Sequence, residues 1–220
     1  MRLSEQKYSY LITRFFPDNI LCGFTKTNIH GLDIPQDMRK VAGELVGEFS
    51  VAYLNQIHSP HTSFIDSQGV YRGDGLLTQE KGIMLVVKTA DCLPVFVYDK
   101  KNSTIGMIHL GWRSARSGII DATGIDFSCA TIIAGIGLRS CCYRVGEEFL
   151  GYDSFVPFLQ RRKKNLYFDP VSFLGAEIVK RGGTQEQLQD IKLCSYCSTK
   201  GYSFRRQKTN KRTLSFIVKL

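Results

Sequence analysis

Three residues of this 220-residue sequence, Cys92, His109 and His58, carry side chains that bind transition metals. Each stands at the edge of a short apolar segment: Cys92 between GIMLVVK (82–88) and PVFVYD (94–99), His109 in TIGMIHL (104–110), and His58 directly after VAYLNQI (51–57). Two imidazoles and one thiolate match a zinc site with an open fourth position, as in catalytic zinc centres, and copper accepts the same ligands. The sequence gaps of 34 and 17 residues match no local metal motif, so spacing alone leaves core packing as the alternative.

The elements that would position these residues are predicted to be strands. The apolar segments are short and rich in β-branched residues, as buried strands are. We predict strands over 51–57, 82–88, 94–99, 104–110, 131–137 and 213–220. The intervening DKKNS (99–103) is typical of a hairpin turn. A hairpin from Pro94 to His109 would bring Cys92 and His109 to one edge of a sheet.

Helices are predicted between and after the strands. One follows His109 over 112–124, and a second covers 146–162, where acidic residues come first and basic residues last, with Pro157 kinking or splitting it. A third begins after Asp169, an N-cap followed by Pro170, and ends before Gly182. Strands grouped with helices, without repeats or linkers, predict an α+β layered architecture in a single domain, residues 1–220.

The composition restricts the compartment and the partners. Seven cysteines, an odd number in a chain without a secretion signal, favour reduced thiols over a disulfide framework. No apolar run approaches the roughly 18 residues that a bilayer span needs. We therefore expect a cytoplasmic protein without a membrane partner, and a monomer.

The basic charge, formally +9, raises the possibility of nucleic-acid binding. Much of the excess lies in RRKK (161–164) and RRQKTNKR (205–212). No aromatic residues alternate with these charges and no nucleic-acid motif accompanies them. We read them as solvated basic faces and do not expect nucleic acid as a partner.

The sequence around the three candidate ligands resembles that of a known family. NQIHS, GDGLLT, TADCLPVFVYD, IHLGWRS, CCYRVG and SFRR occur in this order. Together they resemble the family named after a laccase or polyphenol oxidase domain, regarded as zinc-dependent purine nucleoside phosphorylases and including the YfiH type, or peptidoglycan editing factor. The resemblance runs from about residue 50 to the C-terminus. It implies a four-layer α/β/β/α sandwich with two mixed β-sheets between helices.

The resemblance also implies a function and its ligands. His58, Cys92 and His109 fall on the family's zinc ligands, beside a pocket for a purine nucleoside. The implied reaction is phosphorolysis of adenosine, inosine or guanosine, with methylthioadenosine as a further candidate, to the free base and ribose 1-phosphate. Adenosine deaminase activity is implied beside it. Zinc lowers the pKa of a bound water, which suits deamination.

Three further residues are candidates for chemistry or substrate binding. Asp91, beside Cys92, is a candidate proton shuttle, with ligand orientation or turn capping as its alternative role. Arg113 and Arg206 are candidates for phosphate binding because a guanidinium binds two oxygens at once. The sequence departs from the family near its N-terminus, where GFTKTNIHGLD replaces a stretch with an arginine and paired glycines, and at Arg144, which replaces an acid.

Other functions remain open at this stage. A cysteine hydrolase would use Cys92 as nucleophile and His109 as base without a metal. The family's older name suggests a copper-dependent polyphenol oxidase, or laccase, although the chain has only four histidines for a multicopper centre. Its other name suggests a peptidoglycan precursor editing factor. Cys141 and Cys142 are expected to pack in the core, and Cys194-Ser195-Tyr196-Cys197 is a lone CxxC pair, a weak metal or redox signal.

Overall fold

Two large mixed sheets form the centre of the computed structural model, which describes residues 2–220. The first contains, in spatial order, β1 (Arg2–Glu5), β2 (Ser9–Thr13), β3 (Ile20–Thr25), β16 (Thr213–Lys219), β8 (Ile83–Thr89), β4 (Ser50–Asn55) and β6 (Gly69–Arg72). The second contains β15 (Leu188–Asp190), β11 (Ala130–Ala134), β9 (Leu93–Asp99), β10 (Thr104–Leu110), β7 (Gly75–Thr78) and β5 (Thr62–Phe64). Both combine parallel and antiparallel pairs. The predicted α+β class and the two mixed sheets are confirmed.

The remaining elements lie around these sheets. The α-helices are α1 (Ile34–Ala42), α2 (Trp112–Arg116), α3 (Pro170–Lys180) and α4 (Phe204–Gln207). Short 3₁₀ helices are η1 (Asp121–Thr123), η2 (Phe127–Cys129), η3 (Glu147–Gly151), η4 (Val156–Phe158) and η5 (Gln185–Gln187). A small antiparallel sheet holds β12 (Arg144–Val145), β14 (Asn165–Phe168) and β13 (Leu159–Arg162). Within residues 2–220, no helix combines the length and apolar character needed to cross a bilayer.

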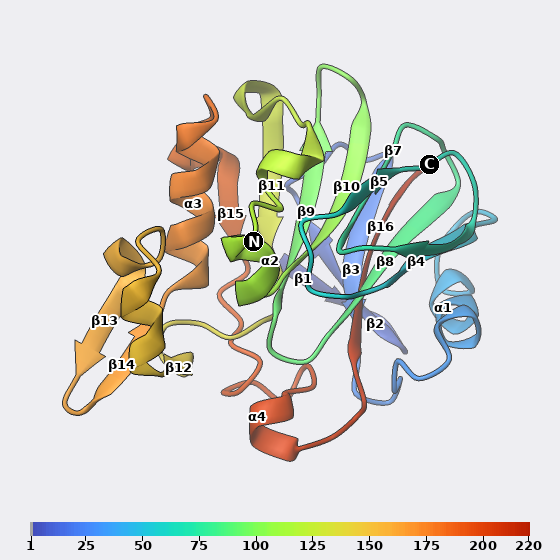
Figure 1. The fold of residues 1–220 in the computed structure, drawn as a ribbon. Helices are drawn as coiled ribbons and strands as arrows, with labels where there is room; N and C mark the ends of the chain where they lie inside the picture. Colours follow the sequence, from blue (N-terminus) through green and yellow to red (C-terminus); the bar gives the residue numbers. More distant parts are fainter. Residues whose placement is uncertain (1) are drawn as a thin grey trace.

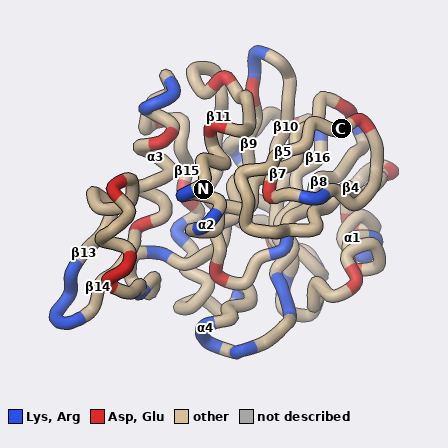
Figure 2. The backbone as a smooth tube through the Cα atoms, viewed as in Figure 1, with Lys and Arg blue, Asp and Glu red and all other residues tan. Residues whose placement is uncertain are grey.

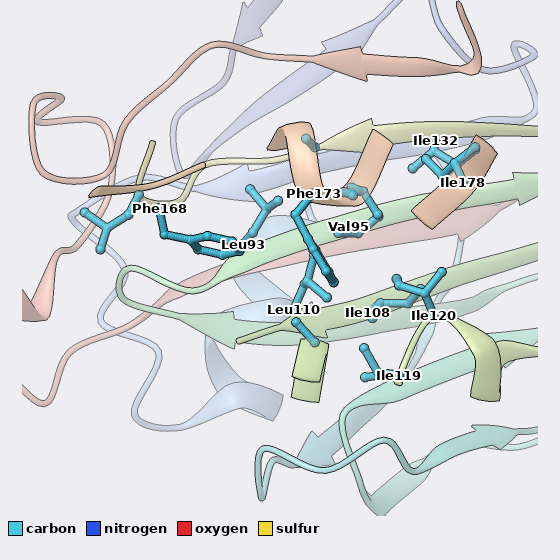
Figure 3. Close-up of a cluster of buried hydrophobic side chains, with 14 of the residues drawn as sticks. Leu93, Val95, Ile108, Leu110, Ile119, Ile120, Ile132, Phe168, Phe173 and Ile178 are labelled. Carbon is cyan, nitrogen blue, oxygen red and sulfur yellow. The ribbon is translucent and has the colours of Figure 1, made fainter. Parts of the chain in front are cut away.

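Strand alternation distributes the core over both faces of each large sheet. In β8, Leu85 and Val87 pack between the two sheets, whereas Met84 and Val86 face outward toward α1. On the outer face of the second sheet, α3 packs its apolar side on β9, β10 and β11, as Figure 3 shows for Phe173 and the strand residues around it. Figure 1 shows α1 and α3 on opposite sides of the two sheets. The outer face of the first sheet packs against α1, whereas α2, α3 and 3₁₀ turns pack on the outer face of the second.

All six predicted strands are present, with ends shifted by at most a few residues. The hairpin at 99–103 is confirmed: the Asp99 carboxylate accepts hydrogen bonds from the backbone N–H groups of Lys101 and Asn102. The predicted N-cap Asp169 is also confirmed, since its Oδ1 accepts from the backbone of Val171 and Ser172. The helix predicted after His109 is shorter than expected, because Gly118 (φ 81°) separates α2 from η1.

The helix predicted over 146–162 is wrong. The segment forms η3 and η4, and then β13, which pairs with β14 in a hairpin whose tip carries RRKK (Figure 2). Glu147 and Arg161 suggested a helix dipole, but their side chains pair directly, with two nitrogen–oxygen distances of 2.8 Å. Pro157 stands in the 3₁₀ turn of η4, where its missing N–H breaks no α-helical hydrogen bond.

Candidate metal centre

The three predicted ligands converge. The ligand atoms of His58, Cys92 and His109, here called the His–Cys–His cluster, all lie within 4.8 Å of one another. His58 Nε2 is 4.0 Å from Cys92 Sγ, and the two imidazole centroids are 4.8 Å apart at an angle of 73°. Residues separated by up to 51 positions therefore present two nitrogens and one sulfur to a single point.

Strand register and two unusual backbone conformations produce this convergence. The antiparallel pair β9–β10 places His109 opposite Pro94, so Cys92 lies at the same sheet edge, as the hairpin predicts. His58 follows β4, which runs parallel to β8, the strand that leads to Cys92. His58 (φ 57°) and Asp91 (φ 106°) have positive φ, which costs energy in residues with a Cβ and is concentrated at functional sites.

Asp74 orients one ligand, although no sequence pattern assigned it a role. It is fully buried, and its Oδ1 lies 2.7 Å from His109 Nδ1. Its Oδ2 accepts from the backbone N–H of Ser59 (2.7 Å), the Ser59 hydroxyl (3.0 Å) and the backbone N–H of Ile57 (3.3 Å). Burial opposes ionisation of Asp74, but the hydrogen bonds from His109 and Ser59 outweigh it and lower its pKa to about 2. The ionised carboxylate can only accept, so Nδ1 carries a proton and Nε2 is directed to the cluster.

The electrostatics of the cluster favour a thiolate at Cys92. Burial opposes ionisation of the thiol, but His109 and His58 outweigh it and lower the Cys92 pKa to about 6. Burial likewise opposes protonation of His109, but Cys92 and Asp74 outweigh it and raise the His109 pKa to about 9. A thiolate is the form of cysteine that binds metals or acts as a nucleophile.

Gly111 allows the ligands to approach the chain closely. A Cβ added at this position would lie 2.9 Å from His58 Cδ2 and 3.3 Å from Cys92 Sγ. Gly111 is also the N-cap of α2, and its N–H donates to the Ser114 hydroxyl at 3.0 Å. The glycine in HLGWRS is therefore required by packing against two of the three ligands.

A cleft of about 550 Å³ opens over the cluster. Its aromatic wall comes from Trp112, Tyr143 and Phe204. Its cationic side chains are Lys88, Arg113, Arg205 and Arg212. Asp91 is the only acidic residue that lines it among the described residues. A cleft that combines aromatic surface with this excess of positive charge suits a flat heterocycle carried together with an anion.

The three other predicted site residues, Asp91, Arg113 and Arg206, lie in different environments. Asp91 lines the cleft, but its Oδ1 accepts from the Ser195 hydroxyl (2.9 Å) and its Oδ2 from the backbone N–H of Arg205 (2.8 Å). Arg113 lines the cleft from an exposed position, with its guanidinium 4.7 Å from the centroid of Trp112. Arg206 does not line the cleft.

Arg206 has a structural environment instead. Its guanidinium donates to four backbone carbonyls: those of Ser195, Tyr196, Ser198 and Gly201. Arg206 is therefore not positioned to bind a ligand in the cleft, whereas its neighbour Arg205 lines it. In a four-residue helix, adjacent side chains point in different directions, and the sequence alone did not show which of the two faces the site.

The altered N-terminal stretch 23–33 lies behind the cleft wall. Among the described residues that line the cleft, none comes from this stretch. The His30 carbonyl accepts a hydrogen bond from the backbone N–H of Arg212 at 2.8 Å, and the Thr27 carbonyl accepts one from the Tyr202 hydroxyl at 2.6 Å. The stretch thus supports the segment that carries Arg212.

The donor set fits zinc better than a multicopper centre. Two imidazoles and a thiolate, with Asp74 behind one imidazole, form the ligand and outer-shell pattern of zinc sites. Among residues 2–220, only two groups of three or more potential ligands come together, and only the His–Cys–His cluster contains histidine. His58, Cys92 and His109 would thus hold a single ion.

The signals for the missed residues were partly present in the sequence. Asp74 stands in GDGLLT, between two glycines, and Gly73 (φ 143°) has a conformation that residues with side chains rarely adopt. A charged residue held in so constrained a loop indicates a specific partner. That the partner is His109, 35 residues away, follows only from the β7–β10 pairing.

The sequence is similar to a family model and to curated proteins. The sequence model of the family described as multi-copper polyphenol oxidoreductase laccase matches residues 28–219. The purine nucleoside phosphorylase of Aquifex aeolicus is 34% identical over 153 residues, 66% of this chain and 70% of its own. That of Borreliella burgdorferi is 31% identical over 175 residues, 71% of this chain and 74% of its own.

Solved structures share the fold. The YfiH protein of Bacillus licheniformis has a TM-score of 0.86 at 21% identity, covering 98% of both chains. YlmD of Geobacillus stearothermophilus has a TM-score of 0.87 at 19% identity, covering 99% of this chain and 98% of its own. Because the family match spans most of the sequence and includes the whole His–Cys–His cluster, this chain belongs to the multi-copper polyphenol oxidoreductase laccase family.

Proposed function

We propose that the chain is a zinc-dependent purine nucleoside phosphorylase that cleaves adenosine, inosine or guanosine with phosphate, and that it also deaminates adenosine. The observation that carries the proposal is the convergence of His58, Cys92 and His109 beneath a cleft with aromatic and cationic walls. The names of the two curated relatives support the same reaction class.

Phosphorolysis needs a bound phosphate and stabilisation of the leaving base. A phosphate oxygen forms a bond to C1′ of the ribose while the bond from C1′ to the purine nitrogen breaks, and the base leaves with the electron pair. Lys88, Arg113 and Arg205 line the cleft and supply the positive charge that would hold the phosphate anion. Positioning the nucleophile against the ribose is the main contribution expected of these side chains.

The aromatic residues would hold the base. Trp112 is anchored from behind by Phe149 (centroids 5.4 Å apart) and by Tyr152 (6.0 Å, nearly parallel at 14°), so its position in the cleft wall is fixed. Tyr143 is largely buried, presents its remaining surface to the cleft and contacts Phe168. Rigid aromatic faces bind a purine at a low cost in side-chain entropy.

The metal and Asp91 have distinct roles in this proposal. Zinc held by the His–Cys–His cluster would act as a Lewis acid that stabilises the negative charge on the departing purine or promotes deamination. Asp91 would keep its part of the cleft in place, because both its oxygens already accept hydrogen bonds from Ser195 and Arg205. It would move a proton only after releasing one of these donors.

Product analysis tests the proposal. The purified protein is incubated with adenosine, inosine or guanosine, with and without phosphate, and the products are identified by chromatography and mass spectrometry. We expect free base and ribose 1-phosphate only with phosphate, and inosine from adenosine without it. The Cys92→Ala variant should lose both reactions, whereas Cys129→Ala, an exposed cysteine outside the cleft, should retain them. Phosphate-independent release of base would refute phosphorolysis.

One observation favours a second candidate, a metal-independent cysteine hydrolase. Cys92, His109 and Asp74 stand in the order of a nucleophile, a base and its orienting carboxylate, with a pKa of about 6 at the thiol. Such an enzyme would form a covalent acyl intermediate on Cys92. Iodoacetamide labelling of Cys92 that is equally fast with and without added zinc would favour it, whereas protection by zinc would favour the metal enzyme.

A further inference from the structure

Four cysteines outside the cleft come together from two distant segments. They are Cys141, Cys142, Cys194 and Cys197, here called the four-cysteine cluster, and their Sγ atoms all lie within 4.8 Å of one another. The first pair belongs to a turn between β11 and β12, and the second to the loop between β15 and α4. All four are free thiols.

Core packing does not explain this cluster, although it was the expectation for Cys141 and Cys142. Cys141 and Cys197 are exposed and Cys142 is only half-buried. A thiol that serves as a small apolar side chain is typically buried, as Cys22 is in this chain. Four sulfurs that meet from segments more than 50 residues apart, with only Cys194 buried, therefore require another reason.

The sulfur–sulfur distances suit a shared metal ion. Zinc–thiolate bonds of about 2.3 Å in a tetrahedron place the sulfurs about 3.8 Å apart. Cys197 Sγ lies 3.9 Å from Cys141 Sγ and 3.3 Å from Cys142 Sγ, and no pair exceeds 4.8 Å. A disulfide joins two sulfurs at about 2.05 Å, well below these distances, and all four thiols are free.

The backbone around Cys194 and Cys197 forms a turn that suits a metal site. These two residues have the CxxC spacing of a zinc-binding turn, closed by the hydrogen bond from Ser198 N–H to the Cys194 carbonyl at 2.9 Å.

We propose that the four-cysteine cluster binds one zinc ion in a structural site, separate from the His–Cys–His cluster. Four thiolates and no open position are the composition of structural zinc sites, whereas catalytic sites keep a position free. This inference does not depend on the proposed enzymatic function, since it rests on the sulfur geometry alone.

An ion in the four-cysteine cluster would hold two segments beside the cleft together. Ser195 stands between the two cysteines of the CxxC turn and donates its hydroxyl to Asp91. Tyr143, which lines the cleft, directly follows Cys142. The ion would therefore join the turn that carries Tyr143 to the loop that orients Asp91.

Zinc counting on the intact chain tests the proposal. Elemental analysis of the purified wild-type protein should find about two zinc ions per chain, one for each cluster. The Cys92→Ala variant, which leaves the four-cysteine cluster intact, should retain about one. Cys197→Ser should also retain about one, and Cys129→Ser, which changes an exposed cysteine outside both clusters, should retain both. A folded Cys92→Ala protein without zinc would overturn the proposal, even if Cys197→Ser fails to fold.

Two further measurements identify the ligands and the ion. Alkylation under denaturing conditions with a chelator and no reductant should modify all seven cysteines. Two fewer modified thiols would reveal a disulfide and overturn the proposal. Cobalt added to zinc-depleted Cys92→Ala should give intense thiolate-to-cobalt absorption, and its absence would equally overturn it. Iron instead of zinc in the purified protein would overturn the assignment of the ion.

Discussion

The substitution Asp74→Asn distinguishes the effect of this carboxylate on metal binding from its effect on folding. The substitution keeps the size of the side chain but exchanges one acceptor oxygen for an NH₂ donor. If the NH₂ faces His109 Nδ1, the imidazole must accept at Nδ1 and carry its proton on Nε2, which blocks the nitrogen directed to the metal. If it faces the other way, it meets the backbone N–H of Ser59, and one donor opposes another. Both orientations disturb the site.

The expected magnitude follows from the hydrogen bonds that the Asp74 carboxylate accepts. Outer-shell partners of metal-binding histidines are worth 10- to 100-fold in metal affinity, about 1.4–2.8 kcal/mol. Asp74 accepts four hydrogen bonds while fully buried, which places it at the upper end of this range. We therefore expect zinc to bind about 30- to 100-fold more weakly to the His–Cys–His cluster in Asp74→Asn.

The assay is a competition titration of zinc against a chromophoric chelator, with Asp99→Asn as the matched control. Asp99 is also a buried aspartate that accepts several hydrogen bonds, but it stands at the opposite end of β9, in the hairpin turn. The control should lose folding stability and keep its zinc affinity. Equal zinc affinity in Asp74→Asn and the wild type would refute the argument that Asp74 fixes the His109 tautomer.

Three other predictions concern the same region. Gly111→Ala should weaken zinc binding about tenfold in a zinc titration, because the added Cβ meets two of the candidate ligands. The control Gly151→Ala, whose added Cβ meets nothing within 4 Å, should bind zinc as the wild type does. Arg205→Gln should raise the KM for phosphate with a smaller change in kcat, whereas Arg206→Gln should chiefly lower the melting temperature, because its guanidinium holds four carbonyls. The pKa of Asp74 is lowered to about 2, so its ionisation adds about 2 kcal/mol to the free energy of unfolding. This contribution is present above pH 4 and is lost between about pH 4 and 2. Urea unfolding at these pH values should show a smaller loss of stability in Asp74→Asn than in the wild type.

Local patterns in the sequence predicted the parts of the fold that local physics controls. The strands around Cys92 and His109 are continuous apolar runs, and Asp99 closes the turn between them through its own neighbours. Asp169 caps a helix within three residues of itself. These interactions are visible in any short window of the sequence, so the hairpin and with it the approach of Cys92 to His109 were predictable.

The features that sequence patterns missed depend on contacts between distant segments. Glu147 and Arg161 gave a correct charge pattern for a helix, but they pair across a chain reversal. Cys142 meets Cys197 from 55 positions away, so neither the paired cysteines nor the lone CxxC motif indicated a four-thiol site by itself. The candidate ligand set was assigned because the motifs around it resemble a family, not because its spacing carries a signal.

The two clusters are linked by the hydrogen bond from the Ser195 hydroxyl to Asp91, and this link changes how metal removal must be interpreted. Loss of activity on chelation would ordinarily distinguish a zinc enzyme from a cysteine hydrolase. Here, removing an ion from the four-cysteine cluster would also release Ser195, and with it the hydrogen bond that orients Asp91 in the cleft. A hydrolase would then lose activity too. Activity should therefore be followed against zinc content during slow chelation of the wild type. If activity is lost in step with Cys92 becoming reactive to iodoacetamide, the His–Cys–His metal is required. If activity persists after Cys92 has become reactive, the metal-independent mechanism is correct.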